Sequence, residues 1–356
     1  MDLSRKDLIL KYIVEYFIRT ASPVGSHTLI EEYQLPYSSA TIRNEMAELE
    51  RNGMIEKTHT SSGRIPSTKG YKYYISYLRE RDLDSEIKNQ LALVLNEKSK
   101  SIEDVIKESC EVLSHMTNLA SVVLGPNADE ERLISVQCIP LAKNSATAVF
   151  VTDKGYVENK TFIFPSDVNI VDVQNCVKML NDRLVGTSIS ALVPKMEVIK
   201  PIITQYVKDN DIIYRAFAEM LLKFTENRVS MFGTDNLFDQ PEFSDNTSAI
   251  KRMMKLLESP EVMKNYRNKG TSSQVFIGDD NDNDDLKNVS VVTSNINVNG
   301  QKRGTIALVG PTRMDYDKVL SALEYVVGEL NKFFNDEGKE DEDGRELRNR
   351  CRKRNR

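Results

Sequence analysis

The stretch Ser38–Gly70, SSATIRNEMAELERNGMIEKTHTSSGRIPSTKG, decides the fold of the first part of the chain. Its first half predicts a helix, because Ile42, Met46 and Leu49 fall at i, i+4 and i+7 and therefore share one apolar face. Gly53 is placed to end that helix, since glycine readily adopts the left-handed conformation of a C-terminal cap. The residues that follow predict a small basic hairpin.

The opposite face of this helix is small and polar. At about 100° per residue it carries Ala40, Thr41, Asn44, Ala47, Glu48 and Arg51, with Arg43 on its flank. Alanines let a partner approach the backbone closely, asparagine can bond an adenine edge with two hydrogen bonds, and arginine can bond guanine or a phosphate. The alternative interpretation is an ordinary solvated amphipathic helix, because glutamates also lie on it, namely Glu45, Glu48 and Glu50.

Two further helices are expected before this one. An apolar stripe over 8–17 predicts a helix that starts at a Ser4 cap and ends near residue 20. After a break at 22–25, Ser26 is expected to cap a short helix, and residues 34–36 form a turn. Three helices with a tight turn before the third are typical of a helix-turn-helix, whose last helix enters the major groove of DNA.

The hairpin after this helix is expected to contact DNA as well. We predict a strand over 54–59, a turn at 60–63 and a return strand at 64–66, followed by a helix capped by Ser67 or Thr68. Such a hairpin would contact phosphates or the adjacent minor groove. Residues 38–81 hold eight basic and five acidic side chains, a balance of +3 in a chain of net charge −5. A basic module on an acidic protein suits a phosphate-binding surface.

The pattern assigns roles to individual side chains of this module. We expect three residues to discriminate bases, namely Thr41, Arg43 and Asn44. We expect a larger set to approach the DNA closely or to bind its backbone: Ser38, Ser39, Ala40, Ala47, Arg51, Lys57, His59, Ser61, Ser62, Arg64 and Lys69.

The remaining chain predicts a multidomain α+β protein. We expect a helix over 84–119, strands at 120–124, 133–140, 147–152 and 156–164, helices over 168–227, strands at 274–277, 289–295 and 305–309, and a last helix over 315–334. This order indicates an antiparallel α+β arrangement with a mainly helical block inside it.

Composition bounds the class of protein and its compartment. At 356 residues the chain has room for two or three domains. No run approaches the roughly 18 apolar residues that would span a bilayer, and the N-terminus MDLSRKDLIL lacks the apolar core of a secretory signal. Four scattered cysteines without CxxC spacing are expected to be free thiols. We therefore expect a cytoplasmic protein that does not bind a membrane.

The sequence contains no recognisable set of catalytic residues. The three histidines lack partners at metal-ligand spacing, and the chain has no GxGxxG, Walker or GxSxG motif, so we expect no catalytic residue, metal or cofactor. Asp279–Asp285 resembles a calcium loop in composition, but it lacks the central glycine and the terminal glutamate, which favours a solvated acidic loop. The charged tail 336–356 cannot fold alone, and it adds either nucleic-acid affinity or only solubility.

Three long segments carry a family resemblance: 38–74, NLFDQPEFSD at 236–245, and GTIALVGPTRMDYDKVLSALEYV at 304–326. Through them the chain resembles the HrcA family of bacterial heat-inducible transcription repressors over about residues 1–335. The resemblance implies a winged helix-turn-helix domain, a GAF-like antiparallel α+β domain, and a dimerisation domain inserted into the latter. The implied boundaries are 1–82 for the winged helix, 83–149 and 226–335 for the linker helix and the GAF-like parts, 150–225 for the insert, and 336–356 for the tail. The strands near 133–164 fit either the GAF-like domain or the inserted dimerisation domain.

The resemblance also implies a function. It implies a homodimer that binds an inverted-repeat operator in double-stranded DNA upstream of chaperone genes, and a chaperonin that keeps the repressor active until heat shock. One alternative is a small-molecule-gated repressor that uses the GAF-like domain as its sensor. The other is an enzyme of unrecognised class.

Overall fold

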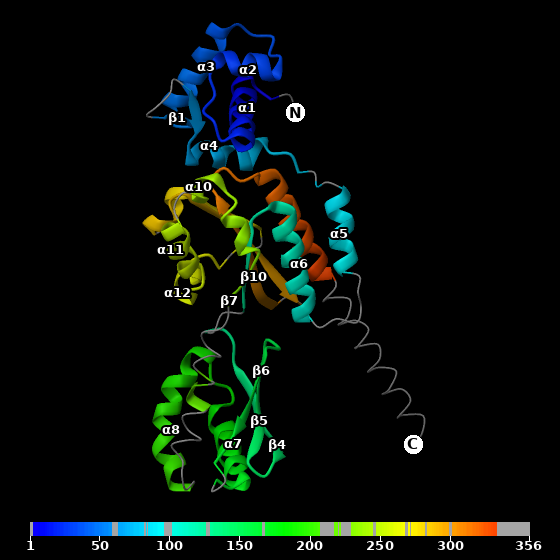
Figure 1. Ribbon diagram of the computed structural model, residues 1–356, viewed down its shortest axis with the longest axis vertical. Coiled ribbons are helices and arrows are strands. Elements are labelled where there is room, and N and C mark those ends of the chain that lie inside the picture. The colour runs from blue at the N-terminus through cyan, green and yellow to red at the C-terminus, as the bar shows by residue number, and fades with distance from the viewer. Residues whose placement is uncertain are drawn as a thin grey trace, which may run out of the picture.

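The computed structural model shows an elongated chain of three bodies, drawn one below the other in Figure 1. We call them the head (residues 3–81), the body (a five-stranded sheet with its helices) and the insert (a three-stranded sheet with its helices). The structure describes residues 3–58, 63–81, 83, 85–95, 102–125, 129–165, 168–206, 217–219, 221, 229–244, 247–267, 270, 272–281, 283–298 and 301–332.

The head begins with three helices, α1 (Arg5–Thr20), α2 (Ser26–Tyr33) and α3 (Ser39–Arg51). The Ser4 side chain caps α1 and the Ser38 side chain caps α3, as expected for hydroxyls that accept from the first free N–H groups. Gly53 follows α3 at φ +69°, in the left-handed region. The expectation that Ser26 caps α2 is wrong, because Gly25 occupies the cap position and Ser26 is the first helical residue.

A small antiparallel sheet completes the head. Its strands are β1 (Ile55–Lys57), shorter than the predicted 54–59, and β2 (Arg64–Pro66), with the predicted bounds. Residues 59–62, which include most of the predicted turn, lie outside the described residues. The segment 22–25 is not only a break, since Val24 exchanges two backbone hydrogen bonds of 2.9 Å with Arg64. The sheet then leads into α4 (Thr68–Tyr73), capped by Ser67 as predicted, and a π-helical turn η1 (Tyr74–Leu78).

The body is an antiparallel sheet in the order β7-β3-β10-β9-β8. Its strands are β3 (Ala120–Leu124), β7 (Val229–Phe232), β8 (Gln274–Ile277), β9 (Val289–Val298) and β10 (Gln301–Pro311). Alternate residues of β10 face two separate cores, because successive side chains of a strand point to opposite faces. Ile306 and Leu308 pack with α5 (Ser85–Leu95), α6 (Ile102–Thr117) and the helix over 316–332, whereas Ala307 and Val309 pack with α11 (Thr247–Leu257) and α12 (Pro260–Lys264).

The predicted continuous helix over 84–119 is wrong. The structure has two helices, α5 and α6, that pack against each other, so the chain reverses between them (Figure 1). The reason is burial, since Leu91 of α5 and Leu113 of α6 belong to the same core and a single straight helix would separate them. Residues 96–101, between the two helices, lie outside the described residues.

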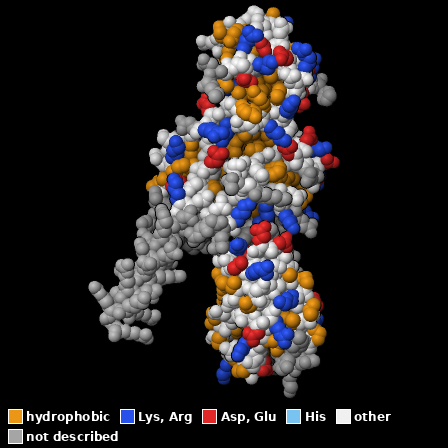
Figure 2. Space-filling view, turned by 180° about the vertical axis from the view of Figure 1, so that it is seen from behind, with side chains coloured by type: hydrophobic (Ala, Val, Ile, Leu, Met, Phe, Trp, Pro, Cys, Tyr) orange, Lys and Arg blue, Asp and Glu red, His pale blue; other side chains and the backbone are white. Residues whose placement is uncertain are grey.

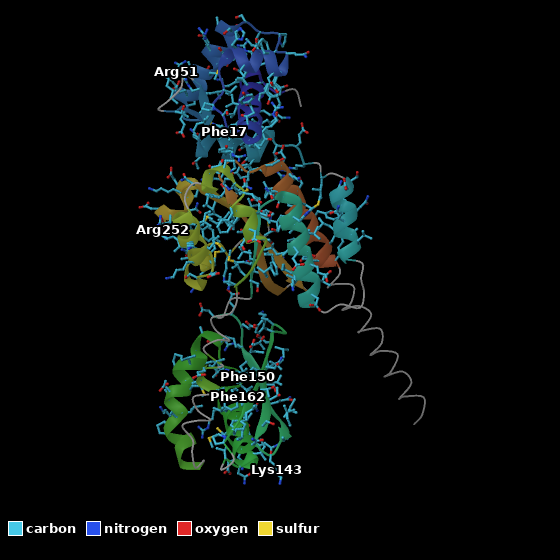
Figure 3. All side chains as sticks on the ribbon, viewed as in Figure 1. Phe17, Arg51, Lys143, Phe150, Phe162 and Arg252 are labelled. Carbon is cyan, nitrogen blue, oxygen red and sulfur yellow. The ribbon has the colours of Figure 1, made fainter. Side chains whose placement is uncertain are left out.

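The insert is a body of its own, with the sheet order β4-β5-β6 and a separate core. Its elements are β4 (Leu133–Ala142), β5 (Ser145–Thr152), β6 (Val157–Ile163), α7 (Ile170–Leu184), the short η2 (Ile189–Ala191) and α8 (Leu192–Tyr206). Phe150 and Phe162 lie on the side of the sheet that meets the helices (Figure 3). An insert that starts at residue 150 is therefore wrong, because that boundary cuts through β5 and separates β4 from the strand it pairs with.

The insert occupies the place of a hairpin loop in the body. β3 ends at Leu124 and β7 begins at Val229, and these two residues are direct antiparallel partners. The whole insert thus leaves and re-enters the body sheet at adjacent strands, which explains why the body keeps one sheet although its sequence is divided.

The head and the body share one hydrophobic core. Tyr71 of α4 lies with its ring centroid 5.4 Å from that of Tyr316, and the Tyr74 hydroxyl donates a 2.8 Å hydrogen bond to Asp317. Burial raises the pKa of both Tyr74 and Asp317, and the hydrogen bond opposes that rise at Asp317. Arg79 adds an ion pair of 3.0 Å to Glu324. Figure 2 shows hydrophobic side chains on both sides of this boundary.

The acidic loop 279–285 also contacts the head. Its Asp280 accepts from Lys72 of α4 at 2.5 Å, and its Asp285 pairs with Arg252 of α11 at 3.2 Å. The buried Asn281 amide donates to backbone carbonyls on both sides of the loop, which fixes its shape. Asp282 lies outside the described residues. Asp280 and Asp285 therefore bind cationic side chains of two neighbouring helices, α4 and α11.

Gly70 is the position where the head tolerates no side chain. A Cβ on Gly70 would lie 2.0 Å from the Met54 carbonyl oxygen, so α4 would have to move away from β1. We expect Gly70→Ala to lower the free energy of unfolding by about 2 kcal/mol or more, measured by urea denaturation.

Gly328→Ala is the matched control, because Gly328 also lies in a helix but nothing is within 4 Å of its added Cβ. It should raise stability by ~0.5–1 kcal/mol through helix propensity alone. Equal effects of the two substitutions would contradict the close approach at Gly70.

Candidate nucleic-acid interface

The outward side of α3 carries an exposed set of small and polar residues. We call this set the reading face: Ala40, Arg43, Asn44, Ala47 and Arg51. Ile42, Met46 and Leu49 are buried on the other side, as the periodicity predicts. The side-chain amide of Asn44 makes no hydrogen bond to any described residue, so both its oxygen and its nitrogen are available. Arg51 lies at the outer edge of the head (Figure 3), where its Nε donates to the Ala47 carbonyl at 3.3 Å.

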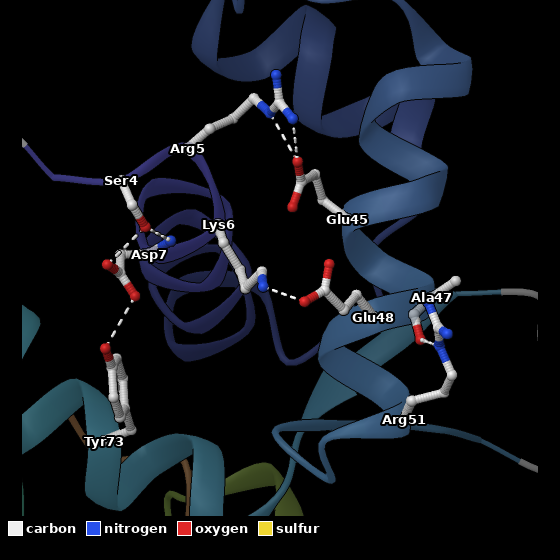
Figure 4. A network of polar contacts seen from close by, with 9 residues as sticks. All are labelled: Ser4, Arg5, Lys6, Asp7, Glu45, Ala47, Glu48, Arg51 and Tyr73. Carbon is white, nitrogen blue, oxygen red and sulfur yellow. Dashed lines mark hydrogen bonds and ion pairs between the residues drawn. The ribbon is translucent and has the colours of Figure 1, made fainter.

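Two glutamates of α3 are bound by α1. The Arg5 guanidinium donates from Nε to Glu45 at 2.7 Å, and the Lys6 ammonium pairs with Glu48 (Figure 4). The hydrogen bond from Lys6 holds the pKa of Glu48 below its ordinary value. The glutamates that favoured an ordinary solvated helix are therefore counterbalanced by cations. Phosphates that approach the reading face would meet less repulsion than the sequence of α3 alone indicates.

The third glutamate binds the hairpin. Arg64 of β2 donates to one oxygen of Glu50 from Nε at 3.0 Å and from Nη2 at 2.8 Å, and its side chain is only 16% exposed. Lys57 of β1 reaches the same carboxylate at 4.0 Å. Arg64 was expected to hold a phosphate, but its guanidinium instead ties β2 to α3. Lys57, with 62% of its side chain exposed, remains accessible.

The hydroxyls at the start of α3 are engaged within the head. Thr41 is half-buried, and its hydroxyl lies 2.9 Å from that of Ser38, whose side chain also accepts the Thr41 N–H. Ser39 is half-buried and its hydroxyl lies 3.1 Å from that of Ser26. Lys69 is exposed and donates to the Asn52 carbonyl at 2.9 Å, beyond the C-terminal end of α3. His59, Ser61 and Ser62 lie outside the described residues.

Sequence reasoning missed three contributors to this surface, namely Arg5, Lys6 and Ser26. Arg5 and Lys6 lie some forty positions before the glutamates that they bind, and no local pattern marks such a pair. Ser26 lies at the start of α2, 7% exposed, where its hydroxyl also accepts from Arg43. Only the packing of the three helices brings these residues together.

Other kinds of site gain no support from the part of the chain that the structure describes. There, no group of three or more His, Cys, Asp or Glu side chains could hold a metal ion. Burial raises the pKa of the Cys110 and Cys176 thiols to about 12, which keeps them protonated and unreactive at neutral pH. Within the same residues, no helix combines the length and apolarity that crossing a bilayer requires.

Comparison with known proteins identifies the family. A family model described as the HrcA protein C-terminal domain matches residues 103–320. The heat-inducible transcription repressor HrcA of Bacillus pumilus is 40% identical over 336 residues, which cover 92% of this chain and 96% of that protein. The chain belongs to the HrcA family.

Other HrcA proteins align as completely. The heat-inducible transcription repressor HrcA of Halalkalibacterium halodurans is 39% identical over 340 residues, covering 93% of this chain and 97% of that protein. The one from Listeria welshimeri is 35% identical over 329 residues, covering 92% and 95%. The HrcA relatives therefore include the head as well as the region matched by the C-terminal family model.

A solved structure shares the fold. A crystal structure described as that of a hypothetical protein superposes with a TM-score of 0.63 and 21% identity, covering 94% of this chain and 99% of that one. At this identity the similarity concerns the fold alone, a mixed α+β chain with antiparallel sheets.

Lys57 and Arg64 should have different roles in this HrcA chain, although both are basic and both lie on the hairpin. We expect Lys57→Met to reduce the slope of log K against log salt for operator DNA by about 1, with unfolding changed by less than ~0.5 kcal/mol. Arg64→Met should lower the free energy of unfolding by ~1–3 kcal/mol, because it removes both guanidinium hydrogen bonds to the half-buried Glu50 carboxylate. A salt slope that falls for Arg64→Met with stability unchanged would show that Arg64 binds phosphate after all.

Proposed function

We propose that this HrcA chain is a dimeric repressor that binds an inverted-repeat operator upstream of chaperone genes, and that the chaperonin keeps it active until heat shock. Its family are repressors of heat-inducible transcription, so the chain negatively regulates heat-shock genes. It therefore acts on double-stranded DNA, and we place it in the cytoplasm, where bacterial operators lie. We assign it no catalytic residue and no cofactor.

The observation that carries the proposal is the reading face of α3. It presents Arg43 and Asn44 beside two alanines, on a helix whose three glutamates pair with cations of the head. Arginine and asparagine are the side chains that bond guanine and adenine edges with two hydrogen bonds each. We interpret α1–α3 with the β1–β2 hairpin as a winged helix-turn-helix, in which α3 enters the major groove and Lys57 and Lys69 contact phosphates.

Thr41 is a weaker candidate for base contact than Arg43 and Asn44. Its hydroxyl is already bonded to Ser38 and its side chain is half-buried, so DNA would have to replace an existing contact. We propose that Arg43 and Asn44 discriminate bases, and that Ala40 and Ala47 allow the close approach which those contacts require.

The dimer is best supported by the outer face of the insert sheet. Residues that alternate with the buried ones carry no charge on any strand: Ser135, Gln137, Ile139, Thr147, Val149, Val151, Val157, Asn159, Thr161 and Ile163. Ile163 is 79% exposed and Val157 is 50% exposed. An uncharged, partly apolar sheet face on the surface is typical of a protein interface. We propose that two copies pair through it and present two reading faces to two half-sites.

The regulatory part of the proposal concerns the body. We interpret the five-stranded sheet with helices on both faces as the GAF-like domain that the resemblance implies. Because the body shares its core with the head, a chaperonin that helps the body to reach its native packing would also set the position of the reading face. We propose that this coupling makes operator binding depend on chaperonin.

Asn44→Ala tests the function together with the reading face. In a mobility-shift titration with an inverted-repeat operator, it should weaken binding by ~1–3 kcal/mol and relax preference at one base position, because one bidentate contact is lost. Asn52→Ala, at the C-terminal end of the same helix, is the matched control and should keep the wild-type preference.

The titration should be run with and without chaperonin and after a heat step. Chaperonin should raise the active fraction of wild-type protein and restore it after heating. Unchanged operator affinity in Asn44→Ala would refute the reading face, whereas indifference to chaperonin would refute only the regulatory part.

Ile163→Asp tests the dimer. Ile163 ends the edge strand β6, and a carboxylate there would be buried without a partner in a paired uncharged face, so we expect the dimer dissociation constant to rise by roughly 100-fold. Light scattering after size exclusion measures the mass. Val198→Asp is the control, since Val198 is 75% exposed on α8, in the helical layer of the insert, and should leave the mass unchanged. A stable dimer of Ile163→Asp at micromolar concentration would exclude this face.

The small-molecule-gated alternative has one observation in its favour. A cavity of about 850 Å³ lies between α1, η1 and the helix over 316–332, and its lining includes Glu15, Tyr74, Leu83, Asp317 and Lys318. Its polar groups are mostly carboxylates, and burial raises the pKa of Glu15. A thermal-shift screen of cationic and neutral metabolites would support this alternative only if a ligand that stabilises the protein also changes operator affinity.

A further inference from the structure

Ser26 occupies the point where the two helices of the helix-turn-helix begin. It is the first residue of α2, and its hydroxyl lies 3.1 Å from that of Ser39, the first residue of α3. The Arg43 Nε donates to the same hydroxyl at 3.3 Å. Ser26 is only 7% exposed, although Arg43 itself is exposed. A buried hydroxyl thus contacts the inner end of a guanidinium whose outer end faces solvent.

The hydrogen-bond inventory allows both contacts at once. A serine hydroxyl has one donor and two acceptor positions, so Ser26 can donate to Ser39 while it accepts from Arg43. The guanidinium has five N–H donors, of which one is at Nε. With Nε engaged, the four N–H donors of the two Nη atoms remain for a partner outside the protein. That end of the group matches the paired O6 and N7 acceptors of a guanine edge.

The contact also reduces the conformational cost of binding. A long exposed arginine gives up considerable rotamer freedom when it is fixed against a base, and this loss weakens association. An arginine that is already held at Nε has less freedom to lose. The gain applies only to the base that Arg43 contacts, because Ser26 touches no other residue of the reading face in the hydrogen bonds described above.

We propose that Ser26 is a positioning residue for base discrimination, which holds Arg43 through Nε so that its Nη atoms meet one base pair of each half-site. This inference rests on the proposed function, and specifically on Arg43 as a base contact. Ser26 does not touch the DNA in this arrangement. It sets the specificity of the residue that does.

The test measures base preference rather than overall affinity. Operators with every substitution at each half-site position are titrated against wild type, Arg43→Ala, Ser26→Ala and the double variant, with folding checked by thermal unfolding. Arg43→Ala identifies the base pair that Arg43 reads. We expect Ser26→Ala to reduce discrimination at that base pair alone by roughly fivefold, as for the loss of one hydrogen bond. In the Arg43→Ala background it should have no further effect on discrimination.

Further variants separate positioning from a structural role. Ser26→Thr keeps the hydroxyl and should retain discrimination even if the added methyl group lowers stability. Ser38→Ala removes the α3 cap without a contact to Arg43, so it should weaken all operators alike. If Ser26→Ala weakens all operators equally, or changes discrimination as much without Arg43, the positioning role is refuted while Arg43 remains a base contact. If Arg43→Ala changes preference nowhere, the base contact in the proposed function fails first, and the inference fails with it.

Discussion

The packing of α4 and η1 against the start of the helix over 316–332 is the contact on which the arrangement of head and body depends. Tyr71 lies against Tyr316, Tyr74 donates to Asp317, and the cluster of buried side chains continues without interruption from the head into the body. Gly70 must remain without a side chain for α4 to reach this position, because the Met54 carbonyl fills the space beside it. The head and its reading face are therefore held in place by a hydrophobic core shared with the body, not by a flexible linker.

Ion pairs within the head decide what the reading face can bind. Each of three glutamates on α3 has a basic partner from another element, Arg5, Lys6 or Arg64, so one set of contacts fixes the helix and reduces its negative charge. An exposed pair such as Lys6–Glu48 adds little stability and acts mainly on the sign of the local potential, whereas the more buried Arg64–Glu50 pair also holds β2 against α3. The helix that looks amphipathic and acidic in isolation is, in its folded surroundings, suited to a polyanion.

Local pattern predicted most of the elements, because caps and periodicity act within one helix or strand. Ser4 and Ser38 mark true helix starts, Gly53 a true end, and Gln274–Ile277 a strand with its predicted bounds. Apart from the cap of α2, which lies one residue earlier than predicted, the failures are non-local. The reversal between α5 and α6, the pairing of β4 with β5 inside the insert, and the use of Arg64 by Glu50 all depend on which segments meet in space. For the candidate site, the residue types could be predicted from the sequence. Which of these side chains are free to contact DNA, and which are bound within the head, could not.

The position of the insert has a consequence for how the chain folds. β3 and β7 are neighbours in the body sheet although Leu124 and Val229 are more than a hundred residues apart along the chain. Closing a flexible loop of that length would carry an entropic cost and slow the pairing. The insert has its own core, so it can fold independently of the body. A folded insert leaves less flexible chain between β3 and β7, which lowers the entropic cost of pairing them.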